Sequence, residues 1–380
     1  MKRKVCMIGS IVPYQNAGPA TYLEGLSKAL AKMIDVSVIT WGPNNKEYKK
    51  DGREIHVIKK TAGTSIRSVI KAKKNCDENE IIHVNHAKMV HISKILLKNP
   101  IVFTVHGYYA HEAVSRGEII ENSRKYKKMM NLEKTAYKHA SELIAVDRRI
   151  YEYLIEKIPE KRECVHHIPN ATDTIMFNPE VSPLVREHLQ LGDRPVVLFL
   201  KGFYPKNGPH IPILAMRDII KEVPDAILLM VGGGPLENEL VTLVKNLDLG
   251  KNVIFTGPVS HTDAPYYYSS SDIVVVPSVR VSGVEEATSI TMLEGMATGK
   301  PVVASNIGGL KETISPEKEN RIGVLFEQGD ARDMAKKTVH LLKNREERER
   351  MGKNAREFIL KRHSWELNAR RVAEIYNKIQ

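Results

Sequence analysis

The sequence predicts an α/β protein built of two Rossmann-like, doubly wound domains. Short β-branched runs alternate with amphipathic stretches of helical length along nearly the whole chain, which is typical of parallel sheets made of βαβ units. The length of 380 residues suits two domains that each close a core, because a domain has roughly 100 to 200 residues. Apolar residues make up 42% and charged residues 27%, which excludes collagen-like and disordered chains.

The first predicted domain spans residues 1–175. The chain opens on Met1 to Lys4, which is basic, and a short apolar run, but no small-residue cleavage pattern follows. We therefore predict a strand here rather than a signal peptide. A helix is expected over Ala20 to Met33. The predicted strands are Lys4 to Ile8, Val36 to Thr40, Glu54 to Ile58, Ile81 to Val84, Ile101 to Val105, Glu142 to Val146 and Cys164 to Ile168.

The second predicted domain spans residues 176–360 and follows a polar, proline-containing stretch. A terminal helix over residues 361–380 carries an apolar stripe and is expected to pack back on the first domain. Two such domains predict a ligand cleft where the carboxyl ends of their sheets face each other. The predicted strands are Val196 to Leu200, Ala226 to Val231, Asn252 to Thr256, Ile273 to Val276, Pro301 to Ala304 and Gly323 to Phe326.

Charge and cysteine usage narrow the possible partners and location. The formal net charge of +12 favours anionic partners such as nucleotides or an acidic membrane surface. Nucleic acid is not expected, because the basic residues are spread through both halves and aromatics are only 6%. No apolar run approaches the roughly 20 residues of a membrane-spanning helix. Three scattered cysteines favour a reducing cytoplasm over a disulfide framework.

The segment 285–305 is the most informative part of the sequence, and it is predicted to form a loop, a helix and a buried strand. Glu286 and Glu294 are eight positions apart, so on one continuous helix they would lie about 12 Å apart along a shared face. Paired carboxylates that cleave one glycosidic bond lie roughly 5 to 9.5 Å apart. This pair therefore suits the two ends of an elongated ligand such as a nucleotide sugar. Amides at the helix start, near Ser289 and Ile290, could receive its diphosphate.

The wider motif resembles the signature of the retaining glycosyltransferases of family 4, which have the two-domain GT-B fold. Other segments occur in the order that this family has, and the resemblance covers essentially the whole chain. The matching segments are Glu286-x7-Glu294, Gly295-Met296-Ala297-x-Gly299-x-Pro301-Val302-Val303-Ala304-Ser305-x-x-Gly308-Gly309, Pro277-Ser278, Val231-Gly232-Gly233-Gly234-Pro235, Thr104-Val105-His106-Gly107 and Ile168-Pro169-Asn170-Ala171-Thr172-Asp173.

The resemblance implies transfer of a sugar from a nucleoside diphosphate sugar to a glycan, lipid or small-molecule acceptor, as in cell-envelope or glycoconjugate biosynthesis. It implies that Glu286 contacts hydroxyls of the donor sugar and that Glu294 contacts the ribose. His106 resembles the family histidine near the reaction centre. Gly18, just before a predicted helix, resembles the family's glycine loop, whose amides approach a phosphate.

The basic residues depart from the family pattern. After the first strand of the second domain the family usually has Gly-Arg-x-x-x-x-Lys-Gly, and both of these cations are missing here. Lys201 and Lys206 each stand one position earlier, and Arg280 lies in a few additional residues before Glu286. We predict that this shifted basic set holds the diphosphate and that Lys206 is the main contact. A lysine is a point charge without the fork of an arginine, so the phosphate geometry should differ.

No metal or other cofactor is expected beside the nucleotide sugar. The sequence contains no Asp-x-Asp motif, consistent with the family's use of protein charges in place of a divalent ion. His83, His86 and His91 form a cluster, but carboxylate or cysteine companions at metal-ligand spacing are absent. Retention without an obvious nucleophile implies, by resemblance, transfer on one face of the sugar with the leaving phosphate deprotonating the acceptor.

The stretch 121–140 suggests a contact with membrane. Its apolar stripe of Met129, Leu132, Ala136 and Ala140 is flanked by basic residues, as in a helix lying on anionic lipid. The favoured interpretation is a surface helix with a solvated basic face. The expected location is cytoplasmic. If the membrane interpretation holds, the protein is peripheral on the membrane and its acceptor is a lipid or a lipid-linked glycan. The basic residues are Arg124, Lys127, Lys128, Lys134 and Lys138.

Other functions are less consistent with the sequence. A dinucleotide-dependent oxidoreductase needs Gly-x-Gly-x-x-Gly, but Gly232 to Gly234 is followed at the third position by Glu237. Epimerisation or phosphorolysis on the same fold fits the order of motifs less well. The alternative that stays open is a degenerate family member that binds a nucleotide, glycan or partner enzyme without transfer, because the usual arginine and lysine are missing.

Overall fold

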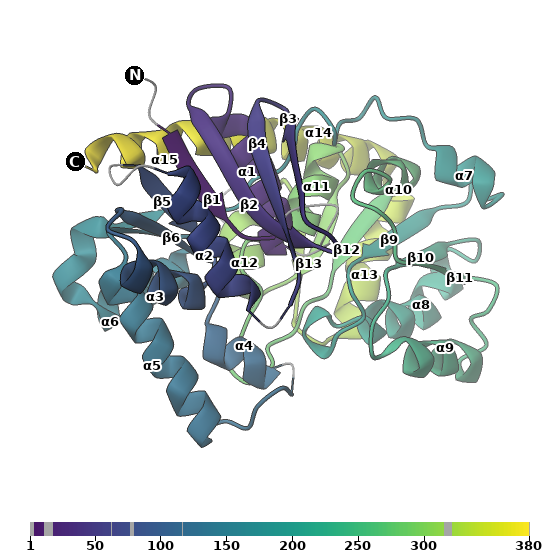
Figure 1. Ribbon diagram of the computed structural model, residues 1–380. Coiled ribbons are helices and arrows are strands. Elements are labelled where there is room, and N and C mark those ends of the chain that lie inside the picture. Colours follow the sequence, from purple (N-terminus) through teal and green to yellow (C-terminus); the bar gives the residue numbers. More distant parts are fainter. Residues whose placement is uncertain are drawn as a thin grey trace. The chain divides into compact units, whose positions relative to one another are not determined.

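The computed structural model describes residues 4–10, 18–61, 63–76, 80–115, 117–314 and 321–379. The chain divides into two compact units (Figure 1). Unit 1 comprises Met1–Ala171 and Trp365–Gln380, and unit 2 comprises Thr172–Ser364. The sequence placed these divisions after residues 175 and 360. Each unit contains a sheet with helices between its strands, so the α/β class predicted from the sequence is confirmed.

Unit 1 is built on one sheet, in which the described strands follow the order β3-β4-β2-β1-β5-β6-β7-β8. Every strand pair is parallel except β3 with β4. The strands are β1 (Lys4–Ile8), β2 (Asp35–Gly42), β3 (Lys46–Lys50), β4 (Arg53–Lys59), β5 (Ile81–Val84), β6 (Ile101–Val105), β7 (Glu142–Ala145) and β8 (Val165–His167). The helices are α1 (Gly18–Leu30), α2 (Thr64–Asn75), α3 (Ala87–Leu96), α4 (Tyr109–Ser115), α5 (Arg124–His139), α6 (Arg148–Lys157), the 3₁₀ helix η1 (Pro159–Cys164) and α15 (Trp365–Lys378).

Strands β5 and β6, at the centre of the unit 1 sheet, are buried at every position and largely apolar, because both faces of the sheet are covered. All four residues of β5 and all five of β6 are buried. Parallel strands covered on both faces are near-continuous apolar runs rather than alternating ones. This is why the sequence located these strands well.

Strand β3 was not predicted, and it lies at an edge of the sheet. Four of its five residues are charged and four are exposed, so it has no apolar alternation that a sequence pattern could detect. It forms by antiparallel pairing with β4, from Lys46 opposite Val57 to Lys50 opposite Arg53. Charged residues suit an edge strand, since they discourage pairing with other chains.

The terminal helix α15 packs within unit 1 against α1. The rings of Tyr22 and Trp365 meet edge to face with centroids 5.4 Å apart. A Cβ at Gly25 would lie 2.2 Å from Trp365 Nε1, so only glycine lets the indole approach the α1 backbone this closely.

Unit 2 is built on a parallel sheet whose described strands follow the order β11-β10-β9-β12-β13-β14. Crossover helices connect these strands, as expected for βαβ units. The strands are β9 (Val196–Leu200), β10 (Ile227–Val231), β11 (Val253–Gly257), β12 (Ile273–Val276), β13 (Val302–Ser305) and β14 (Val324–Phe326). The helices are α7 (Leu184–His188), the 3₁₀ helix η2 (Pro205–Asn207), α8 (His210–Glu222), α9 (Glu237–Asn246), α10 (Ala264–Ser270), α11 (Ile290–Ala297), α12 (Gly308–Ile314), α13 (Ala331–Lys343) and α14 (Arg345–Arg362).

His83 is a buried histidine at the centre of unit 1. Its Nδ1 lies 2.5 Å from Tyr376 Oη, and its Nε2 lies 2.7 Å from Thr104 Oγ1. Burial lowers the pKa of His83 to about 3, and the nearby His106 acts in the same direction. In the folded protein the His83 ring therefore becomes protonated only when the pH falls to about 3. In the unfolded chain it becomes protonated near its ordinary pKa of about 6.5. Between these values the unfolded state holds more protons, so stability falls as the pH drops.

We expect His83→Gln to reduce this pH dependence, because glutamine can still form hydrogen bonds but cannot be protonated. Between pH 6.5 and pH 5 the wild type should lose about 2 kcal/mol more unfolding free energy than the variant. Both tryptophans, Trp41 and Trp365, lie in unit 1, so urea unfolding followed by their fluorescence reports this unit. His188→Gln, on the exposed side of α7, is the matched control. Equal pH slopes in wild type and H83Q would contradict the assignment.

Candidate functional site

The candidate site of unit 2 forms at the carboxyl ends of β9 and β12. Lys201 directly follows β9, and its Nζ lies 2.8 Å from Glu286 Oε1. Ser278, two residues after β12, donates to Glu286 Oε2 over 3.3 Å and accepts from Lys201 Nζ over 3.2 Å. Carboxyl ends of adjacent parallel strands lie at one edge of a sheet, which is why residues far apart in sequence meet here.

The electrostatics around Glu286 keep its carboxylate ionised. Burial raises its pKa, but the charges of Lys201 and Lys206 and the hydrogen bonds from Lys201 and Ser278 outweigh burial, so the pKa lies below its ordinary value. Only 13% of the Glu286 side chain and 10% of the Lys201 side chain are exposed. Glu286 is thus a buried, negatively charged side chain paired with Lys201, and it is not a solvated surface glutamate.

Glycines let the loops that carry these residues pack backbone to backbone. Gly208 has a φ of +61°, and a Cβ there would lie 2.0 Å from Pro277 O. Val279 N donates to Lys206 O over 2.9 Å, which ties the lysine loop to the loop after β12. On the other side, Gly309 N donates to Glu286 O over 2.9 Å, and a Cβ at Gly309 would lie 2.4 Å from Ala287 C. Gly309, a glycine of the signature, therefore holds the backbone of Glu286.

Helix α11 begins at Ile290, so Glu286 precedes the helix and only Glu294 lies on it. The two glutamates do not share one helix, and the 12 Å axial spacing that a continuous helix would give does not apply. The expected loop–helix–strand order is present. Ser289 is the N-cap residue, but its side chain does not cap the helix. Its hydroxyl is buried and has no hydrogen-bond partner among the described residues, next to a helix start where the first N–H groups lack intrahelical acceptors.

Glu294 is nearly buried, and the structure gives it two partners that sequence reasoning missed. Tyr268 Oη donates to its Oε2 over 2.8 Å, and His261 Nε2 lies 2.9 Å from its Oε1. These residues precede Glu294 by 26 and 33 positions. No local motif links them, so the sequence offered no signal for the contact.

Arg280 and Lys206 are placed differently from each other. Arg280 pairs with Glu285 through both Nε, at 2.6 Å, and Nη2, and 61% of its side chain is exposed. Its printed ion pair is with Glu285 and not with Glu286, and its proposed contact with the diphosphate stays a prediction. Lys206 lies on η2, close enough to Glu286 for its charge to lower the pKa of that carboxyl. Of the shifted cations, Lys201 and Lys206 are thus the two that act on Glu286.

In unit 1, His106 directly follows β6, as predicted. Its ring packs edge to face on Tyr22 with centroids 4.7 Å apart, and burial lowers its pKa to about 3. The imidazole is therefore neutral at pH 7. Its Nε2 is buried and has no hydrogen-bond partner within the described ranges. Gly18 is the first residue of α1, and most of the loop before it, residues 11–17, lies outside the described residues. The roles of His106 and Gly18 stay predictions.

The histidines at 83 and 86 lie in separate hydrogen-bonded settings. His83 lies in the network already described, and His86 is the N-cap of α3, where it accepts from Lys88 N over 3.1 Å. Over the described parts of the chain, no group of three His, Cys, Asp or Glu side chains is arranged to hold a metal ion.

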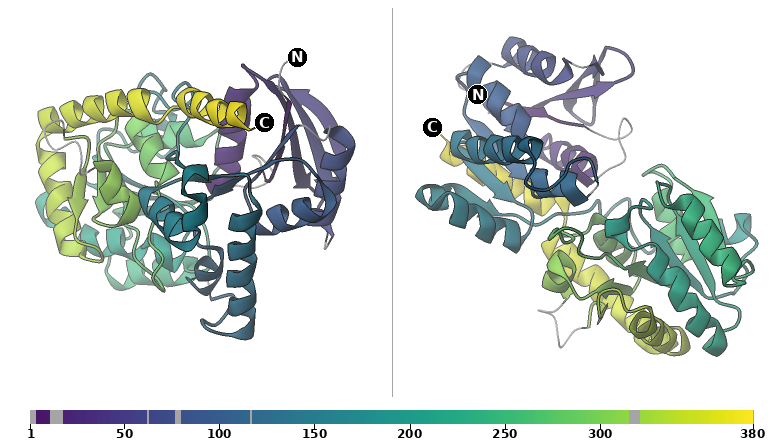
Figure 2. Two further views of the ribbon diagram at one scale, coloured as in Figure 1. Left: turned by 90° about the vertical axis from the view of Figure 1, so that its left-hand side faces the viewer. Right: turned by 90° about the horizontal axis from the view of Figure 1, so that it is seen from below.

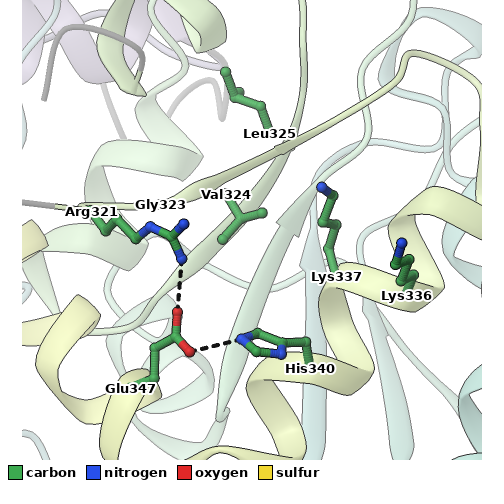
Figure 3. Close-up of a pocket in the computed structure, with 8 residues that line it drawn as sticks. All are labelled: Arg321, Gly323, Val324, Leu325, Lys336, Lys337, His340 and Glu347. Carbon is green, nitrogen blue, oxygen red and sulfur yellow. Dashed lines mark hydrogen bonds and ion pairs between the residues drawn. The ribbon is translucent and has the colours of Figure 1, made fainter. Parts of the chain in front are cut away.

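A hollow of about 390 Å³ lies apart from the site, beside β14, α13 and α14 (Figure 3). Glu347 accepts there from Arg321 Nη1 over 3.1 Å and from His340 Nε2 over 2.7 Å. No predicted site residue is among the residues that line it. These are Arg321, Gly323, Val324, Leu325, Lys336, Lys337, His340 and Glu347.

Helix α5 extends away from the sheet of unit 1 (Figures 1 and 2). Its predicted apolar stripe is largely buried. Ala136 and Ala140 are 0% exposed, and Met129 packs against the small core of Ala110, Ala113, Ile119 and Tyr126. The stripe is therefore used largely in packing within unit 1, and a contact of this segment with membrane stays a prediction. The basic face of the helix is exposed, as the favoured interpretation expected. Among the described helices, none is long and apolar enough to cross a membrane.

Comparison with solved structures defines the fold. Sucrose-phosphate synthase from Thermosynechococcus elongatus matches with a TM-score of 0.80 and 22% identity, over 99% of each chain. HepE from Anabaena, solved in complex with UDP-glucose, matches with a TM-score of 0.78 and 19% identity, again over 99% of each chain. The chain therefore has the GT-B glycosyltransferase fold.

The chain belongs to family 4 of the glycosyltransferases. Residues 17–175 match the family described as "Glycosyltransferase Family 4", and residues 183–358 match "Glycosyl transferases group 1".

Two curated relatives illustrate the family. A GDP-mannose-dependent alpha-(1-6)-phosphatidylinositol monomannoside mannosyltransferase from Mycolicibacterium smegmatis is 30% identical over 215 residues, and the match spans 56% of each protein's length. An uncharacterized glycosyltransferase from Methanocaldococcus jannaschii is 28% identical over 99% of this chain and 98% of its own length. With the first relative the chain thus shares about half the length, and with the second nearly all of it.

Proposed function

We propose that the protein transfers a sugar from a nucleoside diphosphate sugar to an acceptor, with retention of the anomeric configuration and without a bound metal ion. The observation that carries this proposal is the arrangement in unit 2. There the ionised Glu286, held by Lys201, lies four residues before the start of α11, where the hydroxyl of Ser289 is buried and has no partner among the described residues. Membership of family 4 supports the same reaction.

The arrangement suits what the reaction must stabilise. As the donor sugar leaves, the nucleoside diphosphate gains negative charge. The amides at the start of α11, near Ser289 and Ile290, and the cation of Lys206 supply the opposite polarity there. Glu286 accepts hydrogen bonds from hydroxyls of the donor sugar, and Lys201 keeps that carboxylate charged. Glu294 accepts from the ribose, and transfer takes place on one face with the leaving phosphate taking the acceptor's proton.

The relatives suggest which donors and acceptors to examine. One relative's name specifies GDP-mannose and a phosphatidylinositol mannoside, and the HepE structure holds UDP-glucose. We therefore propose a hexose donor carried by GDP or UDP, and an acceptor that is a glycan or a glycolipid.

A nucleotide panel tests the proposal. We expect one nucleoside diphosphate among UDP, GDP and ADP to raise the melting temperature of the full chain, since a ligand at 100 times its Kd adds about 2.7 kcal/mol of stability. Lys206→Ala should weaken the affinity for that nucleotide by about tenfold, because it removes a charge-assisted contact to phosphate. Lys245→Ala, an exposed position on α9, is the control. Calorimetric titration measures each Kd. An unchanged affinity in K206A would discredit the lysine, and a flat panel would discredit nucleotide binding.

The alternative is a degenerate protein that binds the nucleotide without transfer, and the displaced cations favour it. A transfer assay distinguishes the transferase from the degenerate protein. In it the protein is incubated with the best-binding nucleotide sugar and with lipid extract or glycan acceptors. Transfer with the anomeric configuration kept supports the proposal, and an inverted product excludes retention. Nucleotide binding without either transfer or donor hydrolysis supports the alternative. Activity that survives exhaustive chelation supports metal independence, whereas loss of activity that added divalent ion restores overturns it.

We also propose that the basic face of α5 makes a peripheral contact with anionic lipid. With its apolar side buried, this contact is electrostatic and worth about 1 kcal/mol per lysine near the surface. Sedimentation with phosphatidylglycerol vesicles should show binding that is lost at high salt and in the triple variant Lys127→Glu, Lys128→Glu, Lys134→Glu. The control triple, Lys245→Glu, Lys251→Glu, Lys311→Glu, changes exposed lysines of unit 2 and should bind as wild type. Equal loss in both triples would show that net charge alone is responsible.

A further inference from the structure

The buried carboxylate of Glu294 is held by side chains from two other segments. Tyr268 comes from α10, and His261 comes from the loop before that helix. Glu294 is 5% exposed and Tyr268 is fully buried. The Phe177 ring packs against both partners, with centroids 5.3 Å from His261 and 5.7 Å from Tyr268. The side chains of Glu294, Tyr268, His261 and Phe177 therefore form one packed cluster on α11.

The direction of both hydrogen bonds follows from the chemistry of the groups. An ionised carboxylate only accepts, so Tyr268 must donate and His261 must carry a proton on Nε2. Burial raises the pKa of Tyr268 well above its ordinary value, and the charge of Glu294 acts in the same direction. The tyrosine is thus a permanent donor, and its Oη also lies 3.3 Å from Thr291 O on α11.

The two protein donors leave part of the carboxylate unused. A carboxylate offers about four lone-pair positions, and Tyr268 and His261 occupy one on each oxygen. Each carboxylate oxygen thus keeps one position that can accept a further hydrogen bond. Together the two oxygens can accept from two neighbouring hydroxyl groups. Because rotation of the carboxylate would break both protein contacts, these two positions have a fixed direction.

We propose that Tyr268 and His261 are positioning residues that aim Glu294 at the two hydroxyls of the ribose, and that they thereby set a preference for ribonucleotides over 2′-deoxyribonucleotides. The proposal rests on the proposed function, which assigns the ribose to Glu294. It adds that ribose recognition depends on two residues that do not themselves contact the nucleotide.

Binding of matched ribo- and 2′-deoxyribonucleotides tests this role. The Kd values of UDP, GDP and ADP and of their 2′-deoxy counterparts are measured by calorimetry on the full chain. The wild type should bind the preferred ribonucleotide about tenfold more tightly than its deoxy form. Tyr268→Phe and His261→Leu should each bring that ratio close to one while leaving the Kd of the deoxy form within about threefold. His261→Gln keeps an N–H donor and should restore most of the ratio.

Tyr266→Phe is the matched control, because Tyr266 lies on the same helix α10 and is 37% exposed. It should keep the wild-type ratio. If Y268F and H261L weaken the ribo and deoxy forms by the same factor, or keep the ratio, the positioning role is overturned and nucleotide binding stands. If the wild type binds none of the nucleotides, the proposed function fails and this inference fails with it. Circular dichroism shows whether each variant is folded. If Y268F does not fold, H261L alone provides the test.

Discussion

Glu286→Gln should slow sugar transfer by about 100- to 1000-fold while leaving nucleotide binding intact. Glutamine has the shape of glutamate, but it removes the charge that lies 2.8 Å from Lys201 Nζ. Loss of one preorganised electrostatic contact at a reacting centre costs about 100- to 1000-fold in kcat. The nucleoside diphosphate itself should bind as in wild type or more tightly, because a negative charge near its phosphates is gone. Steady-state kinetics with the donor selected by the nucleotide panel, together with calorimetry of the nucleotide, measures both effects.

Glu239→Gln is the control for this change, because Glu239 is exposed on α9 in the same unit. It should leave kcat within about twofold of wild type, as surface changes usually do. A kcat of Glu286→Gln within threefold of wild type would exclude Glu286 from the reaction. A loss of nucleotide affinity that accounts for the whole effect would move Glu286 from the sugar to the nucleotide.

Lys201→Met should reduce both stability and activity. It leaves the nearly buried Glu286 carboxylate without its main counter-ion, and breaking a buried ion pair in this way costs about 3 to 5 kcal/mol. We also expect kcat to fall by about 100-fold, because a protonated Glu286 accepts fewer hydrogen bonds from the sugar. Urea unfolding followed by circular dichroism measures the stability of unit 2, with tryptophan fluorescence as the internal reference for unit 1.

The pH dependence of this loss has a definite sign. In the wild type the pKa of Glu286 is depressed, so its stabilising contribution is present at neutral pH and is lost as the pH falls through the folded pKa. In Lys201→Met, burial acts with less opposition and raises that pKa, so the penalty disappears once the carboxyl is protonated. The gap between wild type and variant should therefore shrink as the pH falls from 7.5 to 5.

A double variant separates the two consequences of losing Lys201. Lys201→Met with Glu286→Gln removes both charges and should regain most of the lost stability without regaining activity. A double variant as unstable as Lys201→Met alone would show that the lysine stabilises unit 2 through packing and not through Glu286.

The sequence predicted most strands of the sheets because burial on both faces selects largely apolar runs. Strands β1, β5, β6 and β12 lie where these runs occur, with the bounds that the runs indicated. The charged edge strand β3 was not predicted, because its pairing with β4 and not its composition makes it a strand. The start of α11 also needed the structure, since the pattern 286–294 is compatible with a continuous helix.

For the site, the sequence identified the charged residues but not how they are paired. Lys201 was assigned to the diphosphate, and the structure pairs it with Glu286, 85 positions away. Arg280 was grouped with the phosphate cations, and the structure shows it paired with Glu285, a contact that the sequence did not indicate. Tyr268 and His261 belong to no motif that was recognised, because their importance comes only from contact with Glu294. Pairings of this kind depend on which strand ends are adjacent, and a single sequence does not encode that locally.

A crystal structure of the full chain with the selected nucleotide sugar bound examines the assignment of all these residues together. We predict the ribose within hydrogen-bond distance of Glu294, the diphosphate at the first turn of α11 beside Lys206, and the donor sugar at Glu286. A nucleotide sugar bound with its ribose at Glu286, or bound away from α11, would contradict the assignment of the site.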